Sequence, residues 1–453
     1  MSGAVLAVVL VGLQVGLMFL WPFRPHAPWF LAGVGGFYLA AAAAWFLLRR
    51  QRLSLGWLVA VSLLLRVMWI PVAPGLSEDA YRYLWDGALM AEGENPYLLA
   101  PQDRPQAQAR HPNLYRQMAH TDRTSVYPPL AQFLFLLNHL LWGPSVAGWK
   151  ILLLIFEAGL LSACWQTGFR QPQDWALWLL NPLVVLEFYS SAHLDLVTSA
   201  LWVEALLFLP AALKRSGGGK GALSPMLLGL SSLTKLTPLI SLPWFWMKIR
   251  GGRPSLRFLL WAGAALSLPL LLFFVWKGEM RATWEAFAAI SDTYHQKWRF
   301  NSPFFLIYEA DRPDILARAE QIFAGACLLL LAQALWRRSK REDPRQTVIS
   351  LAASLYFVLM FFYACSYAVH PWYTSWGLAL YLILGLRFWA GLWLAAASFL
   401  SYLGYWFNYP QVEERVWLLW IEYLPFYALL FRDLWVWVKS MTGPDQESPS
   451  ASR

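Results

Sequence analysis

Long apolar runs separated by short polar segments dominate this chain. An α-helix needs about 20 apolar residues to cross about 30 Å of hydrocarbon, and many of the runs approach that length. The expected spans are 4–21, 29–48, 54–71, 147–167, 175–190, 193–213, 223–247, 256–276, 315–336, 346–366, 372–386, 389–407 and 417–438. The pattern predicts an all-α polytopic membrane protein with about 13 transmembrane helices.

Composition and charge agree with this interpretation. Only 14% of residues are charged, whereas a soluble domain carries roughly a quarter. The net charge of +9 comes from basic residues in short loops between spans, a pattern typical of cytoplasmic loops that does not indicate nucleic-acid binding. Those loops are 49–52, 214–215, 248–253 and 337–345. The first outer loop (72–126), the second (277–314) and the turn 367–373 then lie outside.

The simplest organisation is one transmembrane domain over residues 1–439. The polar tail 440–453 is expected to be disordered and cytoplasmic. The first apolar run lacks a basic leader and a cleavage site, so we expect an uncleaved span. Cys164, Cys327 and Cys365 lie inside apolar runs, which provides neither a disulfide framework nor metal-ligand spacing.

Two apolar segments do not fit simple crossings. Segment 129–142 is short and bounded by prolines and Gly143, so we expect it in the outer interface, or dipping into it. Segment 223–247 has basic loops at both ends but is too short to cross twice. Lys235 and Pro238 interrupt it, which predicts a bent or re-entrant pair of half-helices sheltered by protein or a cavity.

The first outer loop holds the most informative residues. Glu78 and Asp79 are adjacent where an apolar run ends, and ionisable groups at a membrane edge are costly to place. The spacing over 80–92 predicts a helix whose apolar face, with Leu84 and Trp85, lies in the membrane plane and dips inward.

A simpler interpretation of this helix stays open. Asp79 would only N-cap it, and Arg82 would pair with Asp86 one turn later.

Other outer segments each present a histidine, a basic group or aromatic rings. Such cations bind phosphate through charge-assisted hydrogen bonds, and aromatic faces suit a sugar ring or an isoprenoid tail. The candidate donor-phosphate or substrate-binding residues are Arg82, Tyr83, Asp86, Tyr127, His193, Asp195, Lys235, Arg299, Asn301, His370 and Tyr373. Turn, interface-pair and aromatic-belt roles remain alternatives for several of them.

Intramembrane charges are expected to have partners or a function. Lys235 is expected to be paired or to face a polar cavity. The carboxylates Glu157, Glu187 and Glu204 are expected to pair with Lys150, Lys235 or another cation. The chain has no His-x-x-x-His or Glu-x-x-His spacing, so neither a metal site nor another required cofactor is predicted.

Seven motifs, taken in order, resemble the GT-C glycosyltransferases, and most closely their bacterial polyprenyl-phosphate-mannose-dependent branch. The motifs are SEDAYRYLWDG (77–87), GENPY (93–97), VYPPLAQ (126–132), AHLD (192–195), TKLTP (234–238), WRFNS (298–302) and HPWY (370–373). The family's loop follows its first span, whereas here two further hydrophobic segments precede it, and the role of residues 1–52 is not explained.

The resemblance implies a GT-C fold with interfacial helices in the first outer loop. It implies transfer of a sugar, with mannose favoured, from a polyprenyl phosphate to a hydroxyl of a glycan, lipid or protein, with inversion. The reaction would occur on the periplasmic face of a bacterial inner membrane. Asp79 corresponds to the catalytic base with Glu78 beside it, where a second carboxylate would raise the proton affinity of Asp79. The implied contacts to the donor phosphate are Lys235, Arg299, His193 and His370.

Two other functions stay open. A transporter or lipid flippase would be expected to have inverted repeats and charges near the midplane. We find no repeat in the sequence, but a transporter would share the broken helix that carries Lys235. A non-catalytic membrane partner of another transferase would tolerate changes at Glu78 and Asp79.

Overall fold

The computed structural model describes residues 2–213, 220–249, 253–277, 281, 283–285, 300–303, 321–330, 343–408 and 415–442. Over these residues the regular structure is helical, apart from one isolated β-bridge between Phe300 and Ala368. The first part contains α1 (Gly3–Phe19), η1 (Arg24–His26), α2 (Ala27–Arg49), α3 (Leu55–Val67), α4 (Asp79–Ala91), η2 (Pro101–Asp103), α5 (Pro105–Arg110), α6 (Pro112–Gln117), α7 (Pro129–Trp142), α8 (Val146–Gln166), α9 (Pro172–Leu179), η3 (Val184–Ser190), α10 (Asp195–Leu207) and α11 (Leu209–Leu213).

The second part contains shorter and more interrupted helices. They are α12 (Lys220–Ser232), η4 (Thr237–Ser241), α13 (Leu242–Ile249), α14 (Arg253–Lys277), α17 (Pro344–Ala364), η7 (Pro371–Thr374), α18 (Ser375–Ala379), α19 (Tyr381–Leu384), α20 (Ala390–Ala397), η8 (Ser398–Tyr402), α21 (Leu403–Asn408) and α22 (Val416–Thr442). The expected tail from 440 begins inside α22, and the residues after Thr442 lie outside the described part of the chain.

Four helical stretches among the described residues are long and apolar enough to cross a membrane. They are Arg24–Arg49, Val146–Gln166, Leu256–Val275 and Pro344–Ala364, and α1, α3 and α7 are shorter apolar helices. An all-helical membrane protein is therefore confirmed, but the count of about 13 spans is not. Several expected spans are divided: 175–190 comprises α9 and the π-helix η3, with the helix-breaking Pro182 between them.

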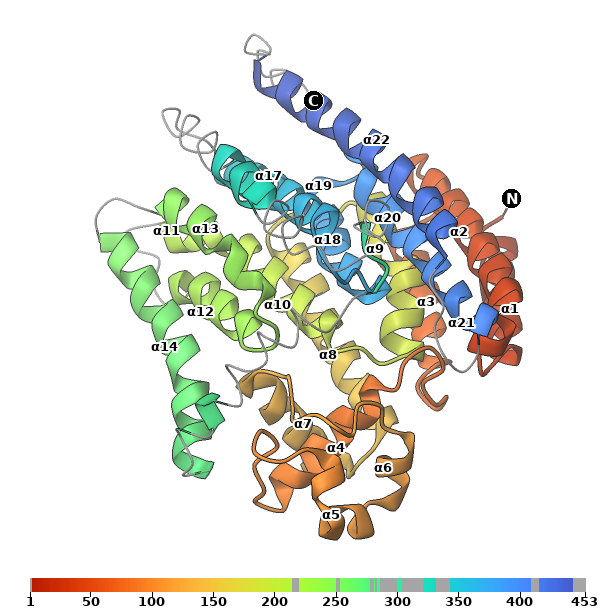
Figure 1. Cartoon of the computed structure of the whole chain (residues 1–453). Coiled ribbons are helices and arrows are strands. Elements are labelled where there is room, and N and C mark those ends of the chain that lie inside the picture. Colours follow the sequence, from red (N-terminus) through yellow and green to blue (C-terminus); the bar gives the residue numbers. More distant parts are fainter. Residues whose placement is uncertain are drawn as a thin grey trace.

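The first outer loop folds into a small helical unit of α4 to α7, at the bottom of Figure 1. Leu84, Trp85 and Leu89 on α4 form a separate apolar cluster with α5 and α6 residues of the same loop. The expectation that this face dips into the membrane is therefore wrong. Residues of α5 and α6, two helices that the sequence pattern did not predict, cover this face instead.

Helix α4 also packs closely on α7, and Gly87 marks the point of contact. A β-carbon at Gly87 would lie 2.4 Å from the carbonyl oxygen of Phe135. The short segment 129–142 is thus a helix of this outer unit, and its first turn is tied to the bundle by hydrogen bonds. The N–H groups of Leu130 and Ala131 donate to the carbonyl of Leu233 at 3.1 and 3.3 Å.

The expected break in segment 223–247 is confirmed. Helix α12 ends at Ser232, and a new turn, η4, starts at Thr237 with Pro238 in its first positions. Lys235 lies in the gap. Helix α12 packs between α10 and α14 (Figure 1), so protein surrounds the interruption on these sides.

Buried polar groups pair inside the bundle. Glu157 on α8 accepts hydrogen bonds from Arg66 Nε at 2.5 Å and Nη2 at 2.7 Å, with both side chains 2% exposed. Trp178 and Tyr189 donate to the same carboxylate. Of the cations left open as partners of Glu157, the structure shows Arg66 of α3, neither Lys150 nor Lys235. The Lys150 ammonium instead donates to two backbone carbonyls.

The N-terminal helices and the C-terminal part of the chain lie side by side. Helices α1 and α2 pack against each other, and η1 and α2 contact α21 (Figure 1). The two additional N-terminal segments, α1 and α2, are thus integrated into the fold.

Candidate active site

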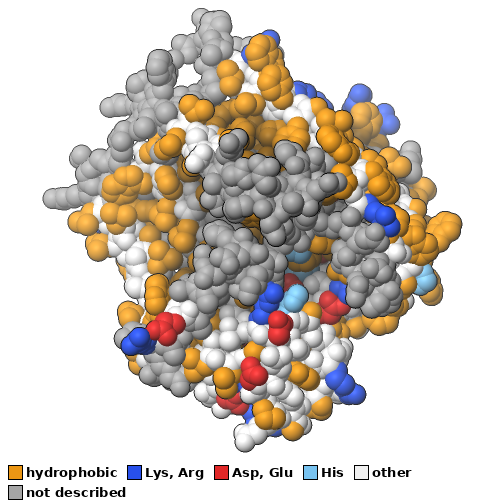
Figure 2. Space-filling model, viewed as in Figure 1, with side chains coloured by type: hydrophobic (Ala, Val, Ile, Leu, Met, Phe, Trp, Pro, Cys, Tyr) orange, Lys and Arg blue, Asp and Glu red, His pale blue; other side chains and the backbone are white. Residues whose placement is uncertain are grey.

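Acidic side chains visible on one face of the molecule lie in the lower half of Figure 2, over and beside the outer unit. The described helices above them are covered mostly by hydrophobic side chains. This contrast is expected where an interfacial layer meets a membrane bundle.

Asp79 begins α4 at the edge of the outer unit. Its N–H donates to Ser77 Oγ at 3.2 Å, and its side chain is 31% exposed. Glu78, not Asp79, occupies the N-cap position. The N-cap interpretation of Asp79 is therefore wrong, whereas the predicted Arg82–Asp86 pair is confirmed at 2.9 Å.

A buried histidine lies directly behind the Asp79 carboxylate. His193 Nδ1 is 3.6 Å from Asp79 Oδ2, and its Nε2 is 3.4 Å from Glu187 Oε2. The side chains of His193 and Glu187 are fully buried, and Tyr402 donates to Glu187 at 2.9 Å. His193 therefore lies between the partly exposed acid and a second, internal acid, without a hydrogen bond to either.

Lys235 lies beside this group and is paired. Its ammonium donates to both oxygens of Asp195, at 2.8 and 2.9 Å, and Trp376 Nε1 donates to Asp195 at 3.0 Å. The Lys235 Nζ is 4.5 Å from the Tyr373 ring centroid and 5.5 Å from that of Trp376. The lysine of the broken helix is thus held by a carboxylate and two aromatic faces.

Four aromatic rings form a column that starts at His193. Trp372 stacks on His193 at 3.8 Å and on His370 at 4.4 Å, and Phe300 stacks on His370 at 4.5 Å. Three distant segments of the chain thereby meet, namely the loop before α10, the second outer loop and the turn before η7. This arrangement groups the predicted His193, His370 and Tyr373.

Burial raises the pKa of Asp79 to about 6, with smaller contributions from Asp195 and Glu78, while Lys235 acts in the opposite direction. The expected effect of Glu78 on Asp79 thus has the right sign, but burial is the larger cause. Burial lowers the pKa of His370 to about 3, assisted by Lys235 and His120. His370 is therefore neutral at pH 7.

Glu78 is neutralised by a residue that sequence reasoning missed. Arg24 of η1 contacts both carboxylate oxygens of Glu78, donates to the Leu76 carbonyl at 3.0 Å, and lies 4.4 Å from the Tyr405 ring centroid. The sequence predicts this turn on the outer side, where a basic residue departs from the positive-inside pattern. That departure is the signal by which Arg24 could have been found.

Other predicted site residues lie deeper or make internal contacts. Asp86 is buried and accepts from Arg82, Ser125 and Gln132. These hydrogen bonds join α4 to Ser125 of the loop and Gln132 of α7, and the Asp86 carboxylate does not reach the surface.

The two predicted tyrosines of the outer unit pack against each other. Tyr83 contacts Tyr127 edge-on at 5.0 Å and accepts from the Leu194 N–H at 3.5 Å. Tyr83 thus connects α4 to the loop that carries His193.

The second outer loop is only partly described. Asn301 is buried, and its amide donates to Val369 O at 3.2 Å and to Glu422 at 2.9 Å. Arg299 lies outside the described residues.

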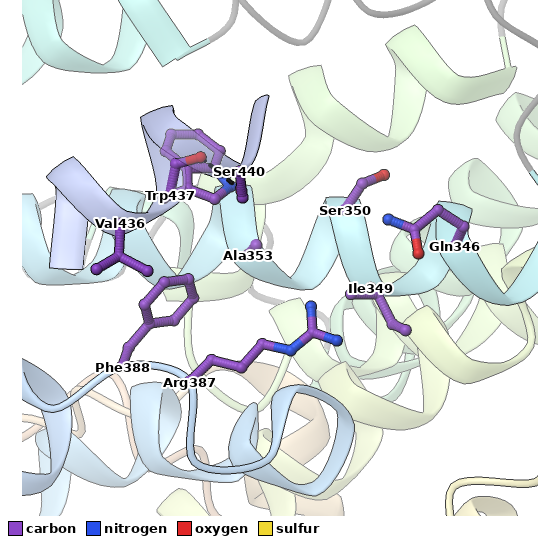
Figure 3. Close-up of a pocket in the computed structure, with 9 residues that line it drawn as sticks. All are labelled: Gln346, Ile349, Ser350, Ala353, Arg387, Phe388, Val436, Trp437 and Ser440. Carbon is purple, nitrogen blue, oxygen red and sulfur yellow. Dashed lines mark hydrogen bonds between the residues drawn. The ribbon is translucent and has the colours of Figure 1, made fainter. Parts of the chain in front are cut away.

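A separate pocket of about 340 Å³ lies between α17, α22 and the turn before α20 (Figure 3). Arg387 and Trp437 line it. None of the predicted site residues is among its lining residues. We therefore assign the chemistry to the group of Asp79, Glu187, His193, Asp195 and Lys235, which is called the Asp79 cluster below.

Comparison with known proteins gives an independent result. The family described as alpha-(1->6)-mannopyranosyltransferase, N-terminal domain, matches residues 14–250, over half of the chain. The chain is also 26% identical over 417 residues to alpha-(1->6)-mannopyranosyltransferase A of Mycobacterium tuberculosis, covering 83% of this chain and 71% of that protein. No solved structure matches. The resemblance inferred from the motifs is thereby confirmed, and the chain belongs to the alpha-(1->6)-mannopyranosyltransferase family.

Proposed function

We propose that this protein is an integral membrane mannosyltransferase that uses a polyprenyl-phosphate mannose donor and acts on the outer face of a bacterial inner membrane. Family membership supports the transferase class. The observation that carries the assignment of the site is the meeting of Asp79, His193 and the Lys235–Asp195 pair, which come from separate segments of the chain.

In the proposed reaction, Asp79 accepts the proton of the acceptor hydroxyl, whose oxygen forms a bond to the anomeric carbon of the sugar. The bond from that carbon to the phosphate oxygen breaks, and the electron pair leaves with the phosphate. Attack opposite the leaving group inverts the anomeric centre. Asp79 suits the role of base because it is partly exposed and its pKa of about 6 leaves it ionised at pH 7.

The phosphate gains charge as it leaves, and fixed cations stabilise that charge. Lys235 is a cation that acts on Asp79, and Asp195 with the Tyr373 and Trp376 rings fixes its position. His370 offers a neutral N–H, and Arg299 remains a proposed phosphate ligand.

His193 is too enclosed to be a surface contact for a phosphate, because its side chain is fully buried between two carboxylates. We assign it to orienting Asp79. This differs from the role in donor binding that the resemblance implied.

A reconstituted assay tests the proposal. Purified protein in lipid nanodiscs is incubated with polyprenyl-phosphate mannose and a mannoside acceptor, and the product linkage and anomer are read by NMR. Asp79→Asn is expected to reduce kcat by about 10²–10⁴-fold, the usual contribution of a general base.

Asp103→Asn is the matched control, because Asp103 is an exposed carboxylate of the same outer loop. It is expected to keep the wild-type rate. Transfer at the wild-type rate by Asp79→Asn would exclude Asp79 as the base. A wild-type protein that binds the donor and moves it across a bilayer without transfer would favour a flippase.

A further inference from the structure

We propose that Arg24, in the turn that joins α1 and α2, is a positioning residue of the active site that holds Glu78 as a paired, neutralised neighbour of the base Asp79. The role as neighbour of a base rests on the proposed function. The ion pair itself does not, and it assigns a task to the turn between α1 and α2, the two helices whose role the resemblance left unexplained.

The geometry of Arg24 is that of a built contact. Its two terminal nitrogens engage both oxygens of Glu78, and one of them also donates to the Leu76 carbonyl at 3.0 Å. The planar guanidinium matches the geometry of a carboxylate in this two-point pairing, which a single ammonium group does not. The side chain is 18% exposed, against 38% for Glu78.

Packing on the far side fixes the guanidinium. It lies 4.4 Å from the Tyr405 ring centroid, and α21, which carries Tyr405, also contacts η1. Arg24 therefore clamps the segment that leads into α4 between the N-terminal turn and a C-terminal helix.

The electrostatic consequence concerns the next residue. A second ionised carboxylate adjacent to Asp79 opposes its ionisation, and pairing that carboxylate with a cation relieves the opposition. The other titratable or charged groups that act on Asp79 or Arg24 are Tyr83, Glu187, His193, Asp195, Lys235, Tyr402 and Tyr405. The variants described next leave all of them in place.

The test measures the ionisation of Asp79 without any sugar donor. Purified protein in nanodiscs is treated with a water-soluble carbodiimide and glycine ethyl ester, which couple to the protonated carboxyl. Fragmentation of the peptide by tandem mass spectrometry separates coupling at Asp79 from coupling at the adjacent Glu78, and the extent at Asp79 is recorded against pH. The midpoint for the wild-type protein is expected near the Asp79 pKa of about 6.

Arg24→Gln removes the cation and leaves Glu78 unpaired, so the midpoint is expected to rise by about one pH unit. Glu78→Gln leaves an unpaired cation and is expected to lower it. The double variant Arg24→Gln/Glu78→Gln removes both charges and is expected to return the midpoint close to the wild-type value.

Arg50→Gln is the matched control. Arg50 is the C-cap of the same helix pair and lies 4.9 Å from the Phe46 ring centroid, so it shares the aromatic contact but not the carboxylate. No change in the midpoint is expected for this variant.

An unchanged midpoint in Arg24→Gln, or no recovery in the double variant, would overturn the proposal and leave Arg24 a purely structural clamp. Should Arg24→Gln fail to fold, Glu78→Gln alone decides, because an unchanged midpoint in that variant has the same meaning. A wild-type protein with the expected midpoint but without transferase activity would refute the proposed function, and with it the role of Asp79 as a base. The pairing of Arg24 with Glu78 and its effect on the ionisation of Asp79 would still stand.

Discussion

At the scale of single residues, the site depends on how neighbouring charges are compensated. The protein packed around the partly exposed Asp79 carboxyl removes water from it and raises its pKa, the neighbouring acids add to the rise, and Lys235 acts against it. Each acid in the cluster has a different neighbour: Arg24 for Glu78, Lys235 for Asp195 and Tyr402 for Glu187. The distribution leaves Asp79 as the partly exposed acid without a dedicated cation in the described part of the chain.

The pH dependence of transfer follows from this arrangement. Because Asp79 must be ionised to accept a proton and its pKa is about 6, kcat/KM is expected to be constant above that pH. Below it, kcat/KM is expected to fall about tenfold per pH unit. Initial rates between pH 4.5 and 8 check this, with Asp103→Asn expected to give the same profile. If kcat/KM falls only near the ordinary carboxyl pKa, or does not fall in this pH range, Asp79 is not the base.

At the scale of elements, periodicity predicted the helices but not which surfaces would cover them. The helix expected over 80–92 is present as Asp79–Ala91, and the break at Lys235 is present. The apolar face of α4 was assigned to the membrane because an amphipathic face does not specify its partner. The short helices that cover it, α5 and α6, have six residues each and show too few turns to produce a periodic signal.

The close packing of α4 on α7 allows a direct test. Gly87→Ala places a β-carbon 2.4 Å from the Phe135 carbonyl oxygen, so the helices must separate, which is expected to cost about 2 kcal/mol. Thermal unfolding of the purified protein measures this.

Gly35→Ala is the control for that substitution. A β-carbon at Gly35, in α2, meets no atom within 4 Å, and alanine favours a helix more than glycine does. Its unfolding temperature is expected to equal or exceed that of the wild type. If Gly87→Ala unfolds at the same temperature as Gly35→Ala, α4 and α7 do not pack as described.

At the scale of the whole molecule, the chain brings distant segments to one site. Asp79, His193, Lys235 and His370 were each identified from local features of the sequence. Their proximity was not, since the pairing of Lys235 with Asp195 and of Glu157 with Arg66 depends on the packing of helices far apart in the chain. The ordered set of motifs identified the family, but the geometry of the site required the fold.

The orientation in the membrane is a prediction at this scale. In a variant without Cys164, Cys327 and Cys365, a cysteine introduced by Gln117→Cys in α6 is expected to react with an impermeant maleimide added to intact spheroplasts. One introduced by Lys439→Cys in α22 is expected to react only after lysis. The reverse result would place the Asp79 cluster on the cytoplasmic side.

The join between the outer unit and the bundle divides the proposed reaction between two parts of the molecule. The base is carried by α4, whereas the lysine and its carboxylate belong to the broken helix and α10. A water-soluble acceptor and a donor with a lipid tail would therefore enter from different solvents and meet at the boundary between these parts. A shift of α4 relative to α10 would change the distance between the proton acceptor and the lysine charge without altering either residue. The boundary between the two parts is therefore a target for inhibitors that bind there and separate them.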